Sequence, residues 1–401
     1  MEMSELRALL TPEGLSLLDS TDSVDGVADV ARTVSRLRAA GHSPDLVSAV
    51  VGQARLRAKA TTKFGDFAAR MLFTRAGLEQ ATRLGVAARH AQRMRRAGIR
   101  SVADLGCGIG GDALGFAGAG LGVLAVDADE VTAAIAAYNL APFGDDAVVR
   151  HGTAQEHLPS PADGQAVWMD PARRTSGHAE TTRVGAEEYS PPLDWAFAVA
   201  SRMPTGIKLG PGHDRDALPA EAEAQWVSAD GSVVELVLWT GALAREGVRR
   251  AALVIRGERS HELTAGADAE DAPVRELGAF LHEPDGAVIR ARLIGDVARS
   301  LDAGMLDERI AYLTSDAAVT SPFVQSFRIR ETMPANPKAI SAVLKAHGIG
   351  TLEIKKRGMD VDPAAFRKKL TLRGDASATL ILTRVGEQRR AILADRVPVA
   401  D

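Results

Sequence analysis

Residues 102–128 read VADLGCGIGGDALGFAGAGLGVLAVDA: a short β-branched run, a glycine-rich turn, a helix-like stretch and a second apolar run. A strand that stops on glycine and passes into a helix is typical of a βαβ unit. The pattern continues downstream, where helix-like VTAAIAAYNL precedes the short apolar runs AVVRHG and AVWMD. Short apolar strands alternating with helical stretches indicate a parallel sheet with helices on both faces. The stretch therefore predicts an α/β fold.

The chain divides into four regions around this pattern. Residues 98–258 hold the predicted sheet, including a hairpin around Asp230-Gly231. Residues 1–97 carry apolar residues at helical spacing, which predicts an N-terminal helical region. Residues 259–327 are expected to be an appendage or linker of the core, with a surface loop at their start. Residues 328–401 alternate strand-like and helical stretches, which predicts a small α+β domain.

Length and composition exclude several classes of protein. The 401 residues are 46% hydrophobic and 25% charged, which is typical of a folded globular protein and not of a disordered or fibrous chain. The single cysteine, Cys107, cannot form an internal disulfide, so a reducing compartment fits. The acidic N-terminus has no apolar signal segment, and no run of residues is apolar enough to cross a membrane. We therefore expect a cytoplasmic protein without a membrane partner.

The glycine turn predicts a bound nucleotide-like ligand at the carboxyl ends of the strands. Gly106, Gly108 and Gly110 remove side chains where the backbone would lie against the ligand, and the helix that follows offers free N–H groups. Asp127, at the end of the second strand, can accept hydrogen bonds from two ribose hydroxyls. The turn therefore has the features of a cofactor site.

The glycines alone leave two cofactor classes open. Gly106, Gly108 and Gly111 also satisfy G-x-G-x-x-G, the fingerprint of a nicotinamide or flavin dinucleotide. Asp104 favours a cofactor with an amino-acid part. An acid two residues before the first glycine would lie close to the negatively charged pyrophosphate of a dinucleotide, whereas it suits the ammonium of an amino-acid ligand. The arrangement Asp-x-Gly-x-Gly-x-Gly resembles the first motif of class I S-adenosylmethionine-dependent methyltransferases. That resemblance implies a Rossmann-like sheet and S-adenosyl-L-methionine as the cofactor.

Two longer stretches extend the resemblance. CGIGGDALGFA followed by AVDADEVTAAIAAYNL resembles the cofactor half of trimethylguanosine synthase and its bacterial relatives. The layout of the whole chain is similar to bacterial methyltransferases with a THUMP-like C-terminal domain. THUMP domains are associated with RNA-modifying enzymes, so the resemblance implies an RNA substrate. The cofactor-binding residues that it implies are Asp104, Gly106, Gly108, Gly110, Gly111, Asp127, Ala128 and Ala154, with Thr74 and Gln80 from a segment that closes over the cofactor.

A second motif, Asp170-Pro171-Ala172-Arg173, follows the apolar run AVWM. It resembles the Asp/Asn-Pro-Pro-aromatic motif of enzymes that methylate exocyclic amino groups of nucleobases. By this resemblance Asp170 and Pro171 orient the acceptor. Arg173 replaces the aromatic ring and could stack on a base or bind a phosphate. Methylation of C5 of uracil through a cysteine nucleophile is excluded, because the only thiol, Cys107, lies in the cofactor turn.

Charge adds a further indication. The net charge is −4, but residues 328–401 hold 15 basic and 8 acidic residues, so the remainder is acidic. A basic module on an acidic body favours a polyanionic partner. The predicted RNA-binding residues are Lys355, Lys356, Arg357, Lys368, Lys369 and Arg373. If the strand and the helix that carry them pack side by side, they form one patch.

Two alternatives remain open at this point. The first is a non-catalytic RNA-binding or assembly factor, in which the cofactor pocket has only a structural role. The absence of the second proline and of the aromatic ring from the motif at residues 170–173 favours it slightly. A small-molecule methyltransferase would need no extended basic module. No cysteine/histidine cluster has zinc-site spacing, so we expect no metal. The oligomeric state, the target nucleotide and the modified atom are not predicted.

Overall fold

The computed structural model describes residues 1–24, 26–173 and 189–398. The chain forms two compact units, each made of several segments. Unit 1 comprises Met1–Leu209, Arg215–Ala222 and Val237–Arg245, and unit 2 comprises Gly210–Asp214, Glu223–Leu236 and Glu246–Asp401. Among the described residues, no helix combines the length and the apolar character that crossing a membrane requires.

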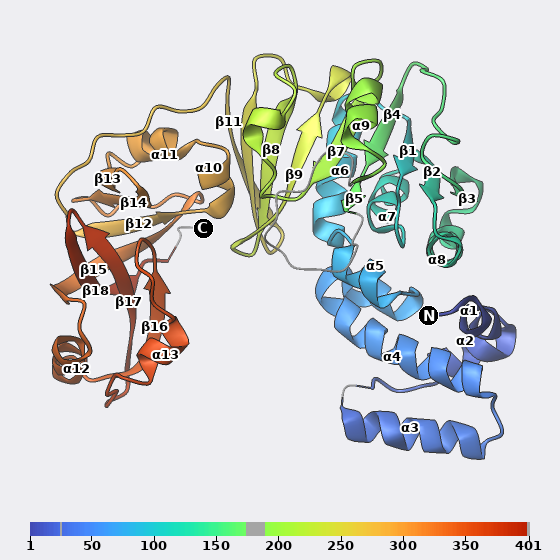
Figure 1. The fold of residues 1–401 in the computed structure, drawn as a ribbon, viewed down its shortest axis with the longest axis horizontal. Coiled ribbons are helices and arrows are strands. Elements are labelled where there is room, and N and C mark those ends of the chain that lie inside the picture. The colour runs from blue at the N-terminus through green and yellow to red at the C-terminus, as the bar shows by residue number, and fades with distance from the viewer. Residues whose placement is uncertain (25, 174–188, 399–401) are drawn as a thin grey trace. The chain divides into compact units, whose positions relative to one another are not determined.

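The N-terminal region is helical, as predicted. Its helices are α1 (Met3–Leu9), α2 (Pro12–Asp19), α3 (Val27–Ala39), α4 (Pro44–Phe64), the 3-10 helix η1 (Gly65–Arg70), α5 (Arg75–Gln80) and α6 (Leu84–Arg96). Ser43 caps α4, because its side chain accepts a hydrogen bond from the amide of Leu46 and Pro44 starts the first turn. Helix α3 lies along α4 (Figure 1).

A nine-stranded sheet forms the predicted α/β core. Its strands are β1 (Ser101–Leu105), β2 (Gly122–Asp127), β3 (Ala147–His151), β4 (Gln165–Met169), β7 (Thr205–Leu209), β8 (Glu223–Ala229), β9 (Ser232–Trp239), β10 (Arg250–Arg256) and β11 (Arg259–Ala265). Their order is β11-β10-β8-β9-β7-β4-β1-β2-β3. Strands β3, β2, β1, β4 and β7 are parallel, so their carboxyl ends meet at one edge. Helices α7 (Gly111–Gly118), α8 (Glu130–Leu140) and α9 (Leu193–Ala200) pack against these strands.

The far end of this sheet confirms one expectation and corrects another. The turn between β8 and β9 is the predicted hairpin, with Asp230 and Gly231 both at positive φ, 51° and 81°, which matches the twist of paired strands. Within the segment 258–273, which was expected to be a surface loop, Arg259–Ala265 form strand β11, antiparallel to β10. Its side chains are mostly polar because it is an edge strand, and this composition hid it in the sequence.

The C-terminal part forms a second sheet of seven strands, in the order β13-β14-β12-β15-β18-β17-β16. The strands are β12 (Phe280–Pro284), β13 (Gly304–Asp307), β14 (Ile310–Ser315), β15 (Val324–Pro334), β16 (Ile349–Lys356), β17 (Ala376–Val385) and β18 (Gln388–Arg396). Helices α10 (Gly286–Arg290) and α11 (Ile294–Ser300) precede β13, and α12 (Pro337–Ala346) and α13 (Pro363–Arg367) follow β15.

Strands β12 to β14 come from the segment expected as an appendage of the core, yet they share a sheet with the C-terminal strands. Pairing with β15 buries Leu281 in one apolar cluster with Tyr312 and Phe327, which the edge of the core sheet would not provide.

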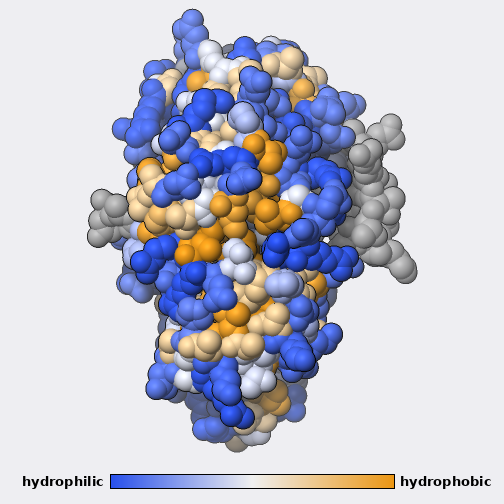
Figure 2. Space-filling model, turned by 90° about the vertical axis from the view of Figure 1, so that its left-hand side faces the viewer, coloured by the Kyte–Doolittle hydropathy of each residue, from blue (hydrophilic) through white to orange (hydrophobic). Residues whose placement is uncertain are grey.

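In the face that Figure 2 presents, hydrophobic side chains gather in a band across the middle, with hydrophilic ones around it.

Candidate active site

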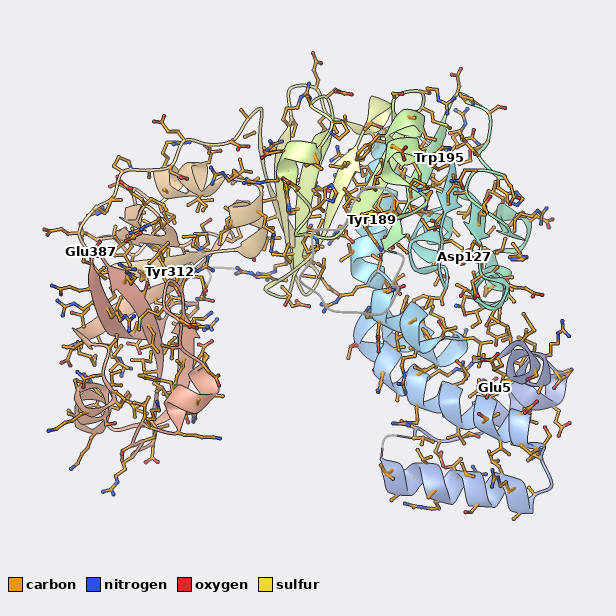
Figure 3. The ribbon with its side chains drawn as sticks, in the orientation of Figure 1. Glu5, Asp127, Tyr189, Trp195, Tyr312 and Glu387 are labelled. Carbon is orange, nitrogen blue, oxygen red and sulfur yellow. The ribbon has the colours of Figure 1, made fainter. Side chains whose placement is uncertain are left out.

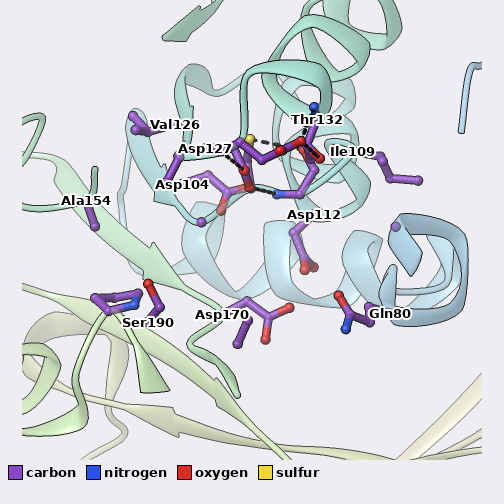
Figure 4. Close-up of a pocket in the computed structure, with 18 of the residues that line it drawn as sticks. Gln80, Asp104, Ile109, Asp112, Val126, Asp127, Thr132, Ala154, Asp170 and Ser190 are labelled. Carbon is purple, nitrogen blue, oxygen red and sulfur yellow. Dashed lines mark hydrogen bonds between the residues drawn. The ribbon is translucent and has the colours of Figure 1, made fainter. Parts of the chain in front are cut away.

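A cavity of about 660 Å³ lies at the carboxyl ends of β1, β2, β4 and β7, within unit 1. The glycine turn after β1 forms one part of its lining, and the segment 74–82 around α5, which contacts the turn, forms another. The site residues predicted from the sequence that line it are Thr74, Gln80, Asp104, Gly106, Gly108, Gly111, Asp127, Ala128, Ala154 and Asp170. The fold thus brings these residues into one pocket from segments far apart in the chain (Figure 4).

Three predicted residues are placed differently. Gly110 does not line the cavity; it caps α7 at φ 88° and faces Leu140 of α8, so its role is to let the turn enter the helix. Pro171 is buried behind Asp170. Arg173 lies in the two-residue strand β5 (Ala172–Arg173), paired with β6 (Tyr189–Ser190), and its side chain is outside the described part of the structure.

The glycine turn is tied to the end of β2. The amide of Gly108 donates to Oδ2 of Asp127 at 2.9 Å, and the amide of Asp129 donates to Oδ1 at 3.0 Å. Gly106 and Gly108 have φ of 98° and 55°, values that a side chain would strain. Burial raises the pKa of Asp127. These hydrogen bonds therefore join the turn to the carboxylate, and Asp127 also lines the pocket.

Asp104 is a buried carboxylate without a partner. Its side chain lines the pocket but is only 1% exposed, and neither oxygen accepts a hydrogen bond. Burial, with the charges of Asp112 and Asp170, raises the pKa of Asp104 well above its usual range. A buried acid left unsatisfied is costly, so it points to a cationic ligand that would complete its hydrogen bonding.

Buried amides hold the segment before α5 against the turn. The side chain of Gln53 exchanges two hydrogen bonds with the backbone of Phe73, at 2.7 and 2.9 Å. Asn139 on α8 binds the amide and carbonyl of Leu72 and donates to the carbonyl of Ile109 in the turn. Thr74 and Gln80 are thereby carried to the pocket rim.

Lys63 fastens the other end of this segment. Its ammonium donates to the carbonyls of Leu78, Glu79 and Ala81, at 2.7–2.8 Å, and so satisfies the carboxyl end of α5. Phe64 and Phe73 pack together in the core with ring centroids 5.7 Å apart, as ordinary core residues do.

Lys208 is a pocket residue that sequence reasoning missed. The register of Met169 with Ile207 places the ends of β4 and β7 side by side. Lys208, 9% exposed, therefore reaches Asp170, with 2.5 Å between Nζ and Oδ2. In Figure 4 the side chains of Asp170 and Gln80 point toward one another below Asp112. A lysine inside the apolar run TGIKLG was the signal that could have found it.

A buried network supports this lysine. Lys208 donates to the hydroxyl of Thr82 at 2.8 Å, and that hydroxyl donates to Oδ2 of Asp112 at 2.7 Å. The other oxygen of Asp112 lies 2.8 Å from Nδ1 of His90, whose ring packs on Trp168. Although burial opposes it, Lys208 and His90 lower the pKa of Asp112 to about 2. Asp112 is therefore ionised at neutral pH and anchors Lys208 beside Asp170.

We expect Lys208→Met to lower the free energy of unfolding by about 2–3 kcal/mol at pH 7. In the wild type the ionised form of Asp112 stabilises the fold above its ordinary pKa of 3.8, and this contribution is lost as pH falls toward 2. The variant lacks Lys208, the cation with the largest effect among the groups that keep this pKa low. The difference between the two proteins is therefore largest above pH 4 and shrinks on acidification.

Urea unfolding followed by tryptophan fluorescence measures this difference, because Trp168 and Trp239 lie next to His90. Lys356→Met, at an exposed lysine, is the control and should change the free energy of unfolding by less than about 0.5 kcal/mol. Equal stability of Lys208→Met and wild type at pH 7 would show that the ion network contributes nothing to the fold.

Comparison with known proteins decides the family. The chain is 32% identical over 359 residues to an uncharacterized S-adenosylmethionine-dependent methyltransferase of Mycobacterium tuberculosis, known as MT3122 in strain CDC 1551 and Rv3037c in strain H37Rv. The match covers 88% of this chain and 95% of the relative. The chain is an S-adenosylmethionine-dependent methyltransferase. S-adenosylmethionine is accordingly its cofactor, and the dinucleotide reading of the glycine turn is not supported.

Other comparisons concern the fold and two segments of the chain. The methyltransferase shares its fold with a crystal structure of an inferred methyltransferase from Porphyromonas gingivalis W83, with a TM-score of 0.71, 19% identity and coverage of 93% of this chain and 99% of that one. Residues 324–396 match the THUMP domain-like family, and residues 2–60 match a domain of unknown function, DUF8688. Among the described residues of the methyltransferase, no cluster of three or more histidine, cysteine or acidic side chains could hold a metal ion.

The C-terminal cations of the methyltransferase do not form the single patch that was expected. Successive side chains of β16 point to opposite faces of the sheet. Lys355 therefore lies over Phe327 and pairs with Glu283 at 2.6 Å, whereas Lys356 shares the face of Ile354 and Leu352. Arg357 also pairs with Glu283, at 3.7 Å. Of the six predicted RNA-binding residues, four are exposed: Lys356, Lys368, Lys369 and Arg373.

Proposed function

We propose that this methyltransferase modifies RNA at an exocyclic amino group of a nucleobase. The observation that carries the RNA substrate is the match of residues 324–396 to the THUMP domain-like family, in a C-terminal region where bases outnumber acids by 15 to 8. A polyanionic acceptor explains this surface, because phosphate contacts need positive charge whereas a small substrate does not. The proposal for the amino group comes from Asp170, which lines the pocket and begins the Asp-Pro-Ala-Arg segment.

We propose that the residues around the glycine turn hold the cofactor. The unsatisfied carboxylate of Asp104 would bind the ammonium, and the free lone pairs of Asp127 would accept the ribose hydroxyls. Gly108 has open space where a side chain would stand. Ala128 and Ala154 would lie along the adenosine, with Thr74 and Gln80 closing the rim. When bound, S-adenosylmethionine supplies an electrophilic methyl carbon on a sulfonium.

Asp170 and Lys208 are proposed to prepare the acceptor. The carboxylate of Asp170 would accept a hydrogen bond from the amino group and so turn the nitrogen lone pair toward the methyl carbon. Lys208 fixes this carboxylate from the protein side, because its ammonium lies 2.5 Å from Oδ2. On methyl transfer the acceptor nitrogen would gain a positive charge, and Asp170 would take its excess proton.

Cys107 takes no part in this chemistry. The thiol is buried, and burial together with Asp104 and Asp127 raises its pKa well above the usual range, so it stays protonated. This supports attack by the acceptor nitrogen itself over covalent catalysis. A buried lone cysteine also fits the cytoplasm, where we propose that the enzyme acts.

We expect the triple variant Lys356→Glu, Lys368→Glu, Lys369→Glu to weaken RNA binding for all sequences alike, because phosphate contacts carry no base information. The slope of log binding constant against log salt concentration should become shallower by about 2, because each of the three lost phosphate contacts contributes roughly 0.7. Fluorescence anisotropy with a labelled structured RNA measures both quantities. The control Lys338→Glu, Lys345→Glu changes exposed lysines of α12. Unchanged affinity and slope in the triple variant would show that these lysines only face solvent.

Transfer of tritium from labelled S-adenosylmethionine tests the proposed substrate. The purified enzyme is incubated with total RNA, total protein extract or the small-molecule fraction from cells that lack its gene. Label in RNA, located in a base amino group after digestion to nucleosides, is the expected result. Label in the small-molecule fraction alone would contradict the RNA proposal and favour a small-molecule methyltransferase.

A further inference from the structure

The most basic part of the chain is not the C-terminal module. Residues 51–100 hold twelve arginines and lysines and two acidic residues. They span most of α4 together with η1, α5 and α6. The net charge of residues 1–327 does not reveal this basic segment, because residues 101–327 hold 34 acidic and 17 basic residues. So strong a local excess of one charge needs either internal partners or an external one.

Several of these cations have internal partners. Arg57 pairs with Asp19 at 2.9 Å and donates to the carbonyl of Met71. Arg93 donates to the carbonyl of Leu243, and the Lys63 ammonium is used by three carbonyls. These groups stabilise the fold and are not available to a ligand.

Arg55, Lys59 and Arg75 differ from those cations. All three are exposed, and within the described part of the chain their side chains form no ion pair or hydrogen bond. Arg55 and Lys59 are four residues apart on α4, so they lie on one face with about 5–6 Å between their Cβ atoms. Arg75 begins α5 across from them.

These three cations line one groove of about 240 Å³ between α1, α4 and α5. Two acids also line the groove. Glu5, on α1 next to α4 (Figure 3), already accepts hydrogen bonds from the hydroxyl of Ser48 at 2.6 Å and from a backbone amide, and Glu79 lies at the other end of α5. The uncommitted charge of the groove is therefore positive.

The groove adjoins the active site. Thr74 lines both the groove and the active-site cavity, so only this residue and its neighbours on the first turn of α5 separate them. A ligand that occupied both would pass across Thr74. Other cations lie beyond it: partial burial lowers the pKa of Lys63, and the charges of Arg83 and Lys208 lower it further. Positive charge thus extends from the groove toward the pocket.

We propose that this groove binds the phosphate backbone of the acceptor RNA strand next to the nucleotide that enters the active site. The inference rests on the proposed function, since it takes the acceptor to be RNA. It adds a second RNA-binding surface, formed by the N-terminal helices and separate in the chain from the THUMP-like module. An RNA strand fits better than an acidic protein because the occupant must be continuous with the substrate in the neighbouring pocket.

The test compares two triple charge reversals in the full-length protein. The groove variant carries Arg55→Glu, Lys59→Glu and Arg75→Glu. The control carries Arg32→Glu, Arg36→Glu and Arg38→Glu, three exposed arginines of α3 that do not line the groove. Anisotropy with a labelled single-stranded RNA of mixed sequence is recorded over a range of salt concentrations, and calorimetry with S-adenosylmethionine shows that each variant is folded.

We expect the groove variant to bind RNA about tenfold or more weakly, with a salt slope shallower by about 2, because three phosphate contacts are lost. The control should stay within about twofold of wild type. Wild-type affinity and slope in the groove variant, or an equal loss in the control, would overturn the inference while the RNA substrate stands. A wild-type protein that binds no RNA would instead contradict the proposed function, and the groove would then have no RNA role.

Discussion

Asp170→Ala is expected to lower the rate of methyl transfer about a thousandfold while leaving the affinity for S-adenosylmethionine within about threefold of wild type. The substitution removes the group that would orient the acceptor nitrogen and take its proton. It leaves the glycine turn and Asp127 unchanged, because Asp170 lies at the end of β4 and contacts Lys208 rather than the turn's hydrogen-bonding amides. Tritium transfer to RNA measures the rate, and calorimetry measures cofactor affinity.

The control for this experiment is Asp163→Ala, which removes an exposed carboxylate just before β4 that does not line the pocket. Its turnover should equal that of wild type. Wild-type turnover in Asp170→Ala would show that the Asp-Pro-Ala-Arg segment has a structural role and takes no part in catalysis. A loss of cofactor affinity equal to the loss of turnover would place Asp170 in cofactor binding instead.

Asp127→Ala should weaken binding of S-adenosylmethionine by about 30- to 1000-fold, which corresponds to about 2–4 kcal/mol. Two effects add in this variant. The ribose hydroxyls lose their acceptor, and the amides of Gly108 and Asp129 lose the carboxylate that holds the turn in place. Isothermal titration calorimetry measures the dissociation constant directly.

Asp127→Asn separates these two effects, since an amide keeps one acceptor oxygen for the turn or for the ribose. Its affinity should lie between those of wild type and Asp127→Ala. If Asp127→Ala binds the cofactor as tightly as wild type, then the carboxylate does not hold the ribose, and the orientation of the cofactor along β2 would have to be revised.

Local patterns predicted much of this architecture. The run SVADL is strand β1, and Gly106, Gly108 and Gly110 adopt positive φ in the turn that follows it. The Asp230-Gly231 hairpin lies where its turn residues indicated. Each of these features depends on backbone preferences of neighbouring residues, which a sequence carries directly. Eight of the ten pocket-lining predictions lie at the ends of parallel strands or in the turns that follow them, and the carboxyl ends of these strands necessarily meet. The other two, Thr74 and Gln80, were implied only by the family resemblance.

Features that depend on pairing between distant strands could not be predicted in this way. Lys208 meets Asp170 only through the register of β7 on β4, and β12 joins the C-terminal sheet because Leu281 buries against Phe327. Lys355 and Lys356 lie on opposite faces of the sheet because side-chain direction alternates from each residue of a strand to the next. Each of these outcomes is decided by tertiary packing and not by the local run of residues.

The central claim is that the pocket around Asp170 methylates an RNA nucleotide. Mass spectrometry of nucleosides from total RNA tests it most directly, in cells that lack the gene and in the same cells complemented with wild type or with Asp170→Ala. We predict one methylated nucleoside that disappears on deletion, returns with wild type and stays absent with Asp170→Ala. Identical nucleoside profiles in all these cells would contradict the claim.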